Sequence, residues 1–366
     1  MSNSIVFNFL DIGMGDCTLV EMPPYGKGPI VLVDCGSHNL TPSNIPYTKA
    51  LKFLNERITK ICQSRSPPSY PEIDHLFISH SDADHWNKLG DLIDSFNPKL
   101  CINNLTVGGK WETEYKTKDK ATFEKIESVL KNKSNVNLAD KQYDMIGNPR
   151  WSINGVNIYL LSSNFPSTKN KTNNKSLVLM FEYDGRKVIL PGDADSTVEK
   201  YIVDEYQKQD PNFLQSIGLK LGHHGSDGST CDEWIDVVKP KAIFGSADKV
   251  WGHPYCPPIM RVMNKGTLDK IGGTHWFICT CPGKDNDYRN ISTNLGICNN
   301  LWYVVTGADE NRIGYDGKQF SGKKGLYTGV QWTLKIDQGK PAEIDHMTDG
   351  LWPVPDPNLT PSFCNP

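Results

Sequence analysis

Residues 77–90 read FISHSDADHWNKLG, and within them four side chains that can bind a metal ion occupy six positions. The run HLFISH has the composition of a buried strand, and a helix is expected over residues 84–96. Imidazole and carboxylate groups together suit zinc, manganese or iron, and a carboxylate in place of an imidazole makes a site harder and more anionic. The stretch therefore predicts a metal-binding turn between a strand and a helix, with the candidate ligands His80, Asp82, Asp84 and His85.

The same stretch also allows a simpler interpretation, in which its serine and aspartate side chains cap the following helix and the histidines are incidental. Two later strands favour the metal site, because each ends in side chains of the same kind. VILPGDAD places Asp193 after a strand and a glycine, and LKLGHHGS places His223 and His224 after another strand. Three strand ends that carry ligand-type residues are typical of a metal site at the edge of a sheet.

Length and composition set the class of protein. A chain of 366 residues with 38% hydrophobic content can bury a large core, as one sizeable domain with additions or two small ones. The N-terminus lacks the pattern of a signal peptide, no run approaches the roughly 18 to 20 apolar residues that span a bilayer, and the ten cysteines are scattered. We therefore expect a soluble, cytoplasmic protein with reduced cysteines and no membrane association.

The net charge of −3 and the pI near 6.3 argue against a protein that coats nucleic acid through many phosphate contacts. Lysines nevertheless gather in residues 110–133 and 169–175. These segments are either a solvated face or a local surface for an anionic substrate.

Short apolar runs alternate with helical stretches, and strands come in pairs and runs rather than as strict βαβ repeats, which favours a mixed sheet. MFEYDGRKVIL and WTLKIDQGKPAEI each place an Asp-Gly or Gln-Gly turn between strand-like segments and predict tight hairpins. Helices are expected at about residues 47–62, 84–96, 123–131, 197–209, 230–238 and 257–265.

These motifs resemble the metallo-β-lactamase superfamily, whose signature is HxHxDH followed by a bridging Asp and a final His. They look most like its branch that contains the hydrolase domain of the DNA-uptake protein ComEC, in which the second His is commonly Asp. The resemblance covers about residues 5 to 282 through FLDIGMGDCTLVE, VLVDCGS, SHSDADH, NNKSLVLMFEYDGRKVILPGDAD, LKLGHHGS and AIFGSADKVWGHPYCPPIMRVM. It implies a four-layered αββα sandwich, with a hydrolase domain over residues 1–282 and a C-terminal extension over 283–366 that packs on or continues it.

The resemblance also implies two divalent metal ions, zinc or manganese, that share a bridging carboxylate. The ligands it implies are His80 and Asp82 for the first metal, Asp84 and His85 for the second, Asp193 as the bridge, and either His223 or His224 as the last ligand.

Five further residues match positions around such a site. Asp34 in VDCG matches a position that supports the metal loop through hydrogen bonds. Asn174 and Ser176 fall where other branches have another histidine ligand, and Ser226 in HHGS would support the site or contact the substrate. His253 in WGHP would approach the site as a substrate contact or proton donor, unless it is only a turn residue before a proline.

One departure from the family pattern follows the ligands. Relatives usually have an apolar residue and two glycines after the DH, whereas this chain has Trp86, Asn87 and Lys88. We expect this bulk to reshape the entrance of the site or to bind a partner.

The resemblance implies a dinuclear metal-dependent hydrolase in which a metal-bridging hydroxide is the nucleophile. Phosphodiester hydrolysis is the natural match, so we expect a phosphodiesterase or nuclease that acts on an anionic phosphoester such as a nucleic acid or nucleotide. Asp84 would orient the hydroxide. His253, or the non-coordinating member of the His223 and His224 pair, would protonate the leaving group.

Two alternatives stay open from the sequence. A similar SHxDxDH motif and double His occur in choline-phosphate esterases of the superfamily, and Trp86, Trp111, Trp251 and Trp276 could form an aromatic cage for a quaternary ammonium. The chain could also be a metal-stabilised interaction component of a multi-protein system such as antiviral defence. In that case the loop-rich region after residue 282 would serve as the surface for a protein partner.

Overall fold

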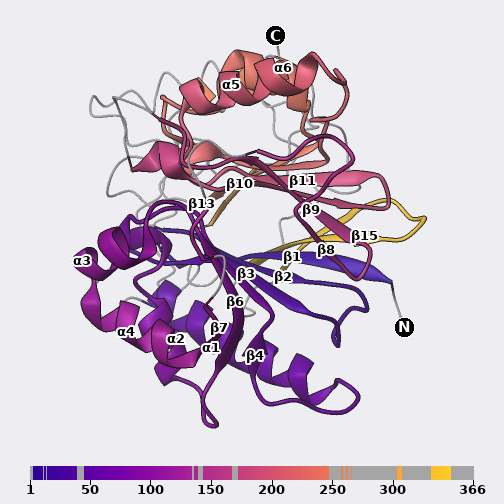
Figure 1. Cartoon of the computed structure of the whole chain (residues 1–366). Coiled ribbons are helices and arrows are strands. Elements are labelled where there is room, and N and C mark those ends of the chain that lie inside the picture. The colour runs from indigo at the N-terminus through magenta and orange to yellow at the C-terminus, as the bar shows by residue number, and fades with distance from the viewer. Residues whose placement is uncertain are drawn as a thin grey trace, which may run out of the picture.

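Two facing sheets with helices on the outer side of each sheet make up the protein (Figure 1). The computed structural model describes residues 3–10, 12–13, 15–38, 45–133, 136–138, 143–166, 172–246, 257–258, 261–262, 265, 303–306 and 331–347. The expected four-layered αββα sandwich is confirmed.

The first sheet is mixed and has the strand order β16-β15-β1-β2-β3-β5-β6-β4, with β7 also paired to β6. Its strands are β1 (Ser4–Leu10), β2 (Cys17–Glu21), β3 (Ile30–Cys35), β4 (Glu72–Ile73), β5 (His75–Ile78), β6 (Cys101–Val107), β7 (Leu130–Asn132), β15 (Gln331–Asp337) and β16 (Glu343–Met347).

The second sheet is also mixed and has the order β14-β13-β12-β11-β10-β9-β8. Its strands are β8 (Trp151–Ile153), β9 (Val156–Ser162), β10 (Val178–Tyr183), β11 (Arg186–Leu190), β12 (Gly218–Lys220), β13 (Ala242–Ser246) and β14 (Tyr303–Thr306).

Helices on the first sheet's side come from the first half of the chain, and those on the second sheet's side come from later residues (Figure 1). The α-helices are α1 (Ile45–Gln63), α2 (Leu89–Asp94), α3 (Lys116–Lys118), α4 (Lys120–Val129), α5 (Ser196–Gln207) and α6 (Asp232–Val238). The shorter turns of helix are η1 (Ala83–His85), η2 (Trp111–Tyr115, a π-helix), η3 (Asn173–Lys175) and η4 (Gly222–Gly225).

Alternation along the strands produces three apolar layers. In β3, Ile30 and Leu32 face the helices of the first half, whereas Val31 and Val33 face the second sheet. Aromatic rings fill the space between the sheets, where Phe9 stacks on Phe244 with ring centroids 4.1 Å apart. Because both faces of each sheet are covered, the ends of the strands are where functional groups reach solvent.

Both expected hairpins are confirmed. β10 and β11 join through Asp184 and Gly185, whose φ angles of 52° and 71° match the primed turn that an Asp-Gly pair favours. β15 and β16 form the second hairpin, and β15 pairs antiparallel with β1 along its whole length. Part of the sequence after residue 282 thus lies in the first sheet, while the domain boundary itself stays a prediction.

The expectation of one helix over residues 84–96 is wrong. The chain makes the short turn η1 and then leaves helical geometry at Trp86, whose φ is −152°, before α2 begins at Leu89. The break lets His85 face the second sheet while Trp86 packs into the core below the first. The expected helix at 257–265 lies mostly outside the described residues.

None of the helices in the described ranges has the length and apolar character needed to cross a membrane. Each cysteine in those ranges is a free thiol: Cys17, Cys35, Cys62, Cys101 and Cys231.

A buried carboxyl group joins α5 to α6 and gives the fold a pH-dependent contact. Glu199 is 1% exposed and accepts the backbone N–H groups of Thr230 and Cys231, at 2.6 and 2.8 Å, where α6 begins. Burial raises the pKa of Glu199 to about 7, although these two hydrogen bonds oppose the rise.

We predict that Glu199 makes the protein less stable as pH rises. The folded state binds this proton more tightly than the unfolded chain, so stability falls between pH 4.5 and about 7 and stays lower above that range. The loss amounts to about 3 kcal/mol at most. Urea unfolding of the native protein and of Glu199→Gln, on either side of this window, measures it. An equal pH dependence in the two proteins would contradict the prediction.

Candidate metal centre

The ligand-bearing turn after β5 is held in place from behind by Asp34 at the end of β3. Asp34 accepts the backbone N–H of Ser79 at 2.6 Å through one oxygen, and its other oxygen lies 2.9 Å from His85 Nδ1. This second contact fixes which ring nitrogen of His85 faces the site. The supporting role that the resemblance implied for Asp34 matches these contacts.

Backbone packing brings the neighbouring turns unusually close to the ligand turn. A Cβ on Gly36 would lie 2.3 Å from the backbone nitrogen of Trp86, so only glycine fits there. The backbone N–H of Asp16 donates to the carbonyl of Asp84 at 3.0 Å, and that of Gly36 donates to the carbonyl of Asp16 at 3.1 Å. The turns before β2, after β3 and after β5 therefore form one unit.

Asp193, 3% exposed in the turn after β11, is the centre of the site. Its Oδ1 lies 3.2 Å from His85 Nε2. Its Oδ2 lies 3.6 Å from His224 Nε2, 3.7 Å from His223 Nε2 and 3.8 Å from His80 Nε2. Four imidazoles from two sheets thus converge on one carboxylate, and each faces it through Nε2.

The two adjacent histidines can both reach Asp193 because of an unusual backbone. His223 and His224 have φ angles of 46° and 53°, in the left-handed region that costs a residue with a side chain about 1 to 3 kcal/mol. His224 Nδ1 is 2.8 Å from the carbonyl of Ser246, and His223 is the more exposed of the two. Both histidines thus face the same carboxylate, and which of them binds a metal stays a prediction.

The remaining carboxylates separate the site into two sides. On one side, Asp82 Oδ2 lies 3.4 Å from His80 Nε2. On the other, Asp84 Oδ2 lies 3.2 Å from His224 Nε2. Asp193 lies between them, as a shared ligand would.

Charge within the site is strongly coupled. Burial would raise the pKa of Asp193, but the imidazoles of His85, His224 and His223 outweigh it and hold that pKa well below its usual range. Burial would likewise lower the pKa of His224, but Asp193, Asp16 and Asp84 raise it to about 9. A set of carboxylates that attracts protons to the imidazoles is also a set that attracts divalent cations.

Orphaned ligand atoms show that the residues fit metal ions. His80 Nε2, His85 Nε2 and Asp193 Oδ1 are buried, and none makes a hydrogen bond in the described part of the chain. Buried polar atoms normally have partners. Imidazole nitrogens and carboxylate oxygens aimed at one another without hydrogen bonds are the donor set that zinc and manganese take.

The residues expected around the ligands take different positions. Ser176 Oγ accepts the backbone N–H of Asp193 at 3.0 Å and lies 3.4 Å from His80 Nδ1. Asn174, fully buried, faces Asp195 at 3.0 Å and holds the loop after Asp193.

Ser226 follows the two histidines in a half-buried turn, and its backbone N–H donates to the carbonyl of His223. His253 lies outside the described residues.

Trp86 lies below the ligand turn and does not itself line the entrance of the site. It is fully buried, and its indole N–H donates to the carbonyl of Ser81 at 3.2 Å. Asn87 holds the backbone of Ser37 through both ends of its amide, and Lys88 is 5% exposed. These side chains brace the ligand turn instead of lining its mouth.

The expected aromatic cage also loses two of its four members. Trp86 and Trp111 are 0% and 2% exposed, so neither can contact a substrate, while Trp251 and Trp276 lie outside the described residues.

A buried ion pair behind the histidines was missed from the sequence. Lys220 Nζ, at the end of β12, lies 2.6 Å from Asp16 Oδ2, with both side chains at most 5% exposed. The carboxylates of Asp16 and Asp193 more than offset burial and hold the pKa of Lys220 above its usual range. A lysine within the apolar run GLKLG was the available signal.

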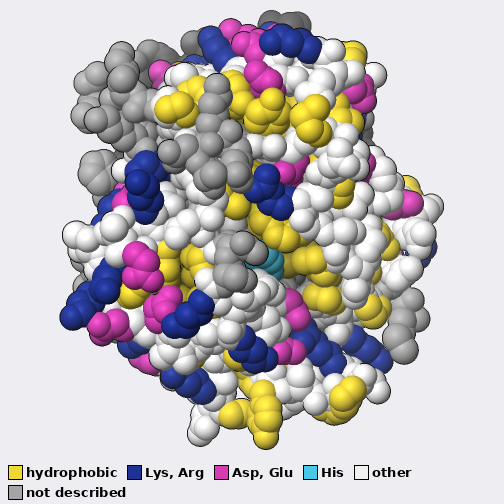
Figure 2. Space-filling model, viewed as in Figure 1, with side chains coloured by type: hydrophobic (Ala, Val, Ile, Leu, Met, Phe, Trp, Pro, Cys, Tyr) yellow, Lys and Arg dark blue, Asp and Glu magenta, His cyan; other side chains and the backbone are white. Residues whose placement is uncertain are grey.

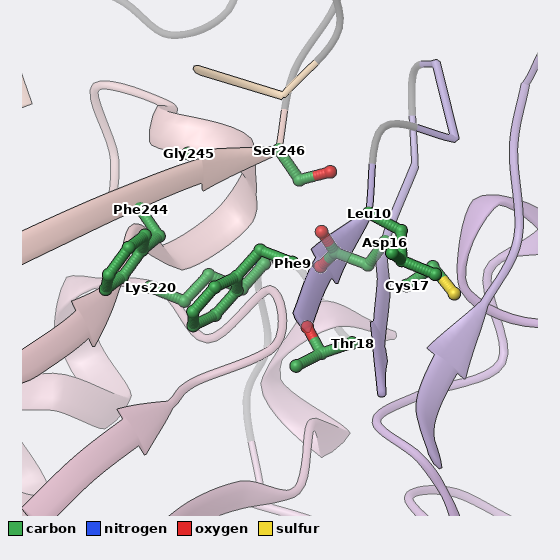
Figure 3. A pocket seen from close by; sticks show the side chains of 9 residues that line it. All are labelled: Phe9, Leu10, Asp16, Cys17, Thr18, Lys220, Phe244, Gly245 and Ser246. Atoms are coloured by element: carbon green, nitrogen blue, oxygen red, sulfur yellow. Dashed lines mark ion pairs between the residues drawn. The ribbon is translucent and has the colours of Figure 1, made fainter. Parts of the chain in front are cut away.

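Asp16 belongs to the same cluster but lies on its far side. Asp16, His85, Asp193 and His224 bring one possible ligand atom each to within 4.8 Å of the others. Asp16, however, approaches the Nδ1 atoms of His85 and His224, at 3.6 and 3.7 Å, whereas Asp193 approaches their Nε2 atoms. Asp16 therefore positions the two rings from behind, next to the small pocket in Figure 3.

His38 is a second residue that the sequence analysis missed. Its Nε2 lies 3.1 Å from Asp84 Oδ2, and its side chain is 40% exposed. The His38 side chain therefore contacts Asp84 of the ligand turn and is also accessible to solvent.

Comparisons with known proteins agree with the family resemblance. Residues 10–242 match the model of the metallo-beta-lactamase superfamily. The chain is 29% identical over 252 residues to ComE operon protein 3 of Bacillus subtilis (strain 168), covering 68% of this chain and 29% of that protein. It is 30% identical over 118 residues to competence protein ComA of Neisseria gonorrhoeae, covering 32% of this chain and 16% of that protein. The chain thus spans less than a third of the length of either relative.

Among solved structures, the short form of human tRNase Z has 13% identity and a TM-score of 0.35, covering 65% of this chain and 91% of that one.

We predict that removing Lys220 alone destabilises the fold strongly. Lys220→Met leaves the Asp16 carboxylate buried without its cation, which costs about 3 to 5 kcal/mol. The double variant Asp16→Asn, Lys220→Met loses less, because no isolated charge remains. Urea unfolding measures the stability of Lys220→Met, of Asp16→Asn and of the double variant. Lys120→Met, at a side chain 70% exposed, is the control. A double variant as unstable as the sum of the two single variants would contradict coupling.

Proposed function

Because the chain belongs to the metallo-β-lactamase superfamily, we propose that it is a dinuclear metal-dependent hydrolase of phosphodiesters in nucleic acid or nucleotides. The observation that carries the proposal is the buried carboxylate of Asp193 with four imidazole Nε2 atoms 3.2 to 3.8 Å away. His80 Nε2, His85 Nε2 and Asp193 Oδ1 make no hydrogen bond among the described residues, and a divalent ion at this point would satisfy all three buried atoms.

The ligand set follows the two sides of the site. His80, Asp82 and His223 would hold one divalent ion, zinc or manganese, and Asp84, His85 and His224 would hold the other. Asp193 would serve both. Bound there, such a pair supplies positive charge to the attacked group and lowers the pKa of a bound water.

The protein's own groups then orient the reactants. Hydrogen bonds from His224 and His38 outweigh burial and hold the pKa of Asp84 well below its usual range. Its carboxylate is therefore ionised at neutral pH and can accept a hydrogen bond from the attacking water. His38, with a side chain 40% exposed, can donate a hydrogen bond to the leaving oxygen. His253 stays a predicted second donor.

The choice of a phosphodiester is supported by the surface around the site. Figure 2 shows a histidine side chain exposed near the centre of the face, with Lys and Arg side chains on several sides of it. Lys118 and Lys175 come from the two lysine-rich segments and lie at the rim, on the side of Asp82. One relative is a competence protein by its title, which agrees with the resemblance to the DNA-uptake branch, and that resemblance supports a nucleic-acid substrate.

The competing functions have less support. With Trp86 and Trp111 buried, nothing in the described residues favours a choline ester. An interaction role through the region after residue 282 stays a prediction, because most of that region lies outside the described residues. The cytoplasmic location likewise stays a prediction.

We predict that His80→Ala and Asp84→Ala each lower kcat/KM by about 100-fold or more, because each removes a ligand from the site. Hydrolysis of single-stranded DNA and of bis(p-nitrophenyl) phosphate measures the loss, and elemental analysis measures bound metal. Asp94→Ala, at a surface carboxylate 59% exposed, is the matched control. Full activity in both site variants would sink the mechanism.

A further inference from the structure

The ligand turn after β5 also contacts a second segment, which lies at the rim of the site on the side of Asp82. Trp86 packs edge-on against Trp111 and Tyr115, with ring centroids 6.3 and 5.1 Å away. Trp111 also contacts Phe123 of α4, at 4.7 Å. Trp86, at the position where relatives have an apolar residue, thus anchors the segment from Trp111 to Lys120 against the turn.

This anchored segment delivers one cation to the ligand set. Lys118, at the end of α3, donates to Asp82 Oδ1 at 2.6 Å and to Ser81 Oγ at 3.0 Å. Burial would raise the pKa of Asp82, but the nearby imidazole of His80 and the ammonium of Lys118 hold it well below its usual range. Within the described ranges, Lys118 is the lysine that contacts an expected metal ligand at the rim of the site.

The two oxygens of Asp82 face opposite ways. Oδ2 lies 3.4 Å from His80 Nε2, inside the site, whereas Oδ1 meets Lys118 on the outer side. The carboxylate of Asp82 therefore lies between Lys118 and the position where the proposed metal ions would bind the scissile phosphate. A group that it binds would lie beside the scissile phosphate, not on it.

Lys118 retains binding capacity toward solvent. Its side chain is 37% exposed, and its ammonium has three N–H groups, of which two are used by Asp82 and Ser81. A second lysine strengthens this rim, since Ser81 donates to Glu114 and Lys175 Nζ lies 2.7 Å from the other oxygen of Glu114.

We propose that Lys118 is a specificity-determining residue that binds a phosphate oxygen next to the scissile phosphodiester, so that the site prefers substrates with consecutive phosphodiesters. This inference rests on the proposed function for the chemistry at the metals. The recognition itself depends only on the chain's own lysine and the carboxylate it flanks. Single-stranded nucleic acid is the substrate class with that chemistry.

The first arm of the experiment measures binding without turnover. Fluorescence anisotropy follows a short, labelled phosphorothioate oligothymidylate bound to the metal-loaded protein at several salt concentrations. Lys118→Ala is expected to weaken binding about tenfold and to reduce the slope of log Kobs against log salt by about 0.7, the loss of one phosphate contact on a single strand. Lys118→Arg is expected to restore the slope.

Lys120→Ala is the matched control, since Lys120 lies two residues away, is 70% exposed and pairs only with Glu124 among the described residues. Its slope is expected to equal that of the native protein. Equal losses in the two alanine variants would show a diffuse charge effect and overturn the proposal. Failure of the native protein to bind the probe would overturn it too.

The second arm compares two substrates. With Lys118→Ala, KM for an oligonucleotide is expected to rise about tenfold, and by a clearly smaller factor for bis(p-nitrophenyl) phosphate, which has one phosphodiester. Equal effects on both substrates, or a loss of bound metal, would mean that Lys118 only holds Asp82 and would overturn the proposal.

The two proposals fail separately. Binding that depends on Lys118 in a protein that hydrolyses neither substrate supports the inference and contradicts the proposed function. Hydrolysis of both substrates without dependence on Lys118 supports the proposed function and contradicts the inference.

Discussion

The structure depends on one buried cation, the ammonium of Lys220 between the two sheets. Burying a charge costs several kcal/mol unless it is well paired, and here the pair joins β12 of one sheet to the turn before β2 of the other. The carboxylates of Asp16, Asp193 and Asp34 all raise the pKa of Lys220 against the effect of burial. The ammonium in turn offsets the repulsion between those buried carboxylates. The same ion pair therefore joins the two sheets and balances part of the negative charge of the site.

Much of this fold could be predicted from the sequence, because its signals are local. Alternating apolar residues such as those of β3 specify which side of a strand is buried, and the Asp184-Gly185 pair specifies its turn through backbone geometry alone. Ligand-type side chains placed directly after strands were enough to bring His80, Asp193 and the two adjacent histidines to one edge.

The features that could not be predicted from the sequence depend on contacts between distant segments. The direction of His223 and His224 is set by two left-handed backbone conformations, and HHGS as a string permits either histidine to face the site. The broken helix after His85 follows from packing of Trp86 on aromatic residues some 25 or more positions later, which no helical pattern could anticipate. Lys118 looked like one of many surface lysines, because its partner is 36 residues away.

The replacement of an imidazole by Asp82 and the presence of Trp86 are best understood together. A carboxylate ligand adds a negative charge to a site that would bind an anionic substrate, and repulsion between them weakens binding unless a cation lies nearby. Trp86 supplies the apolar surface on which the segment carrying Lys118 folds, and Lys118 brings that cation to the exposed oxygen of Asp82. The bulk of Trp86 and the carboxylate of Asp82 thus act together across the ligand turn, one by placing the segment and the other by pairing with its lysine.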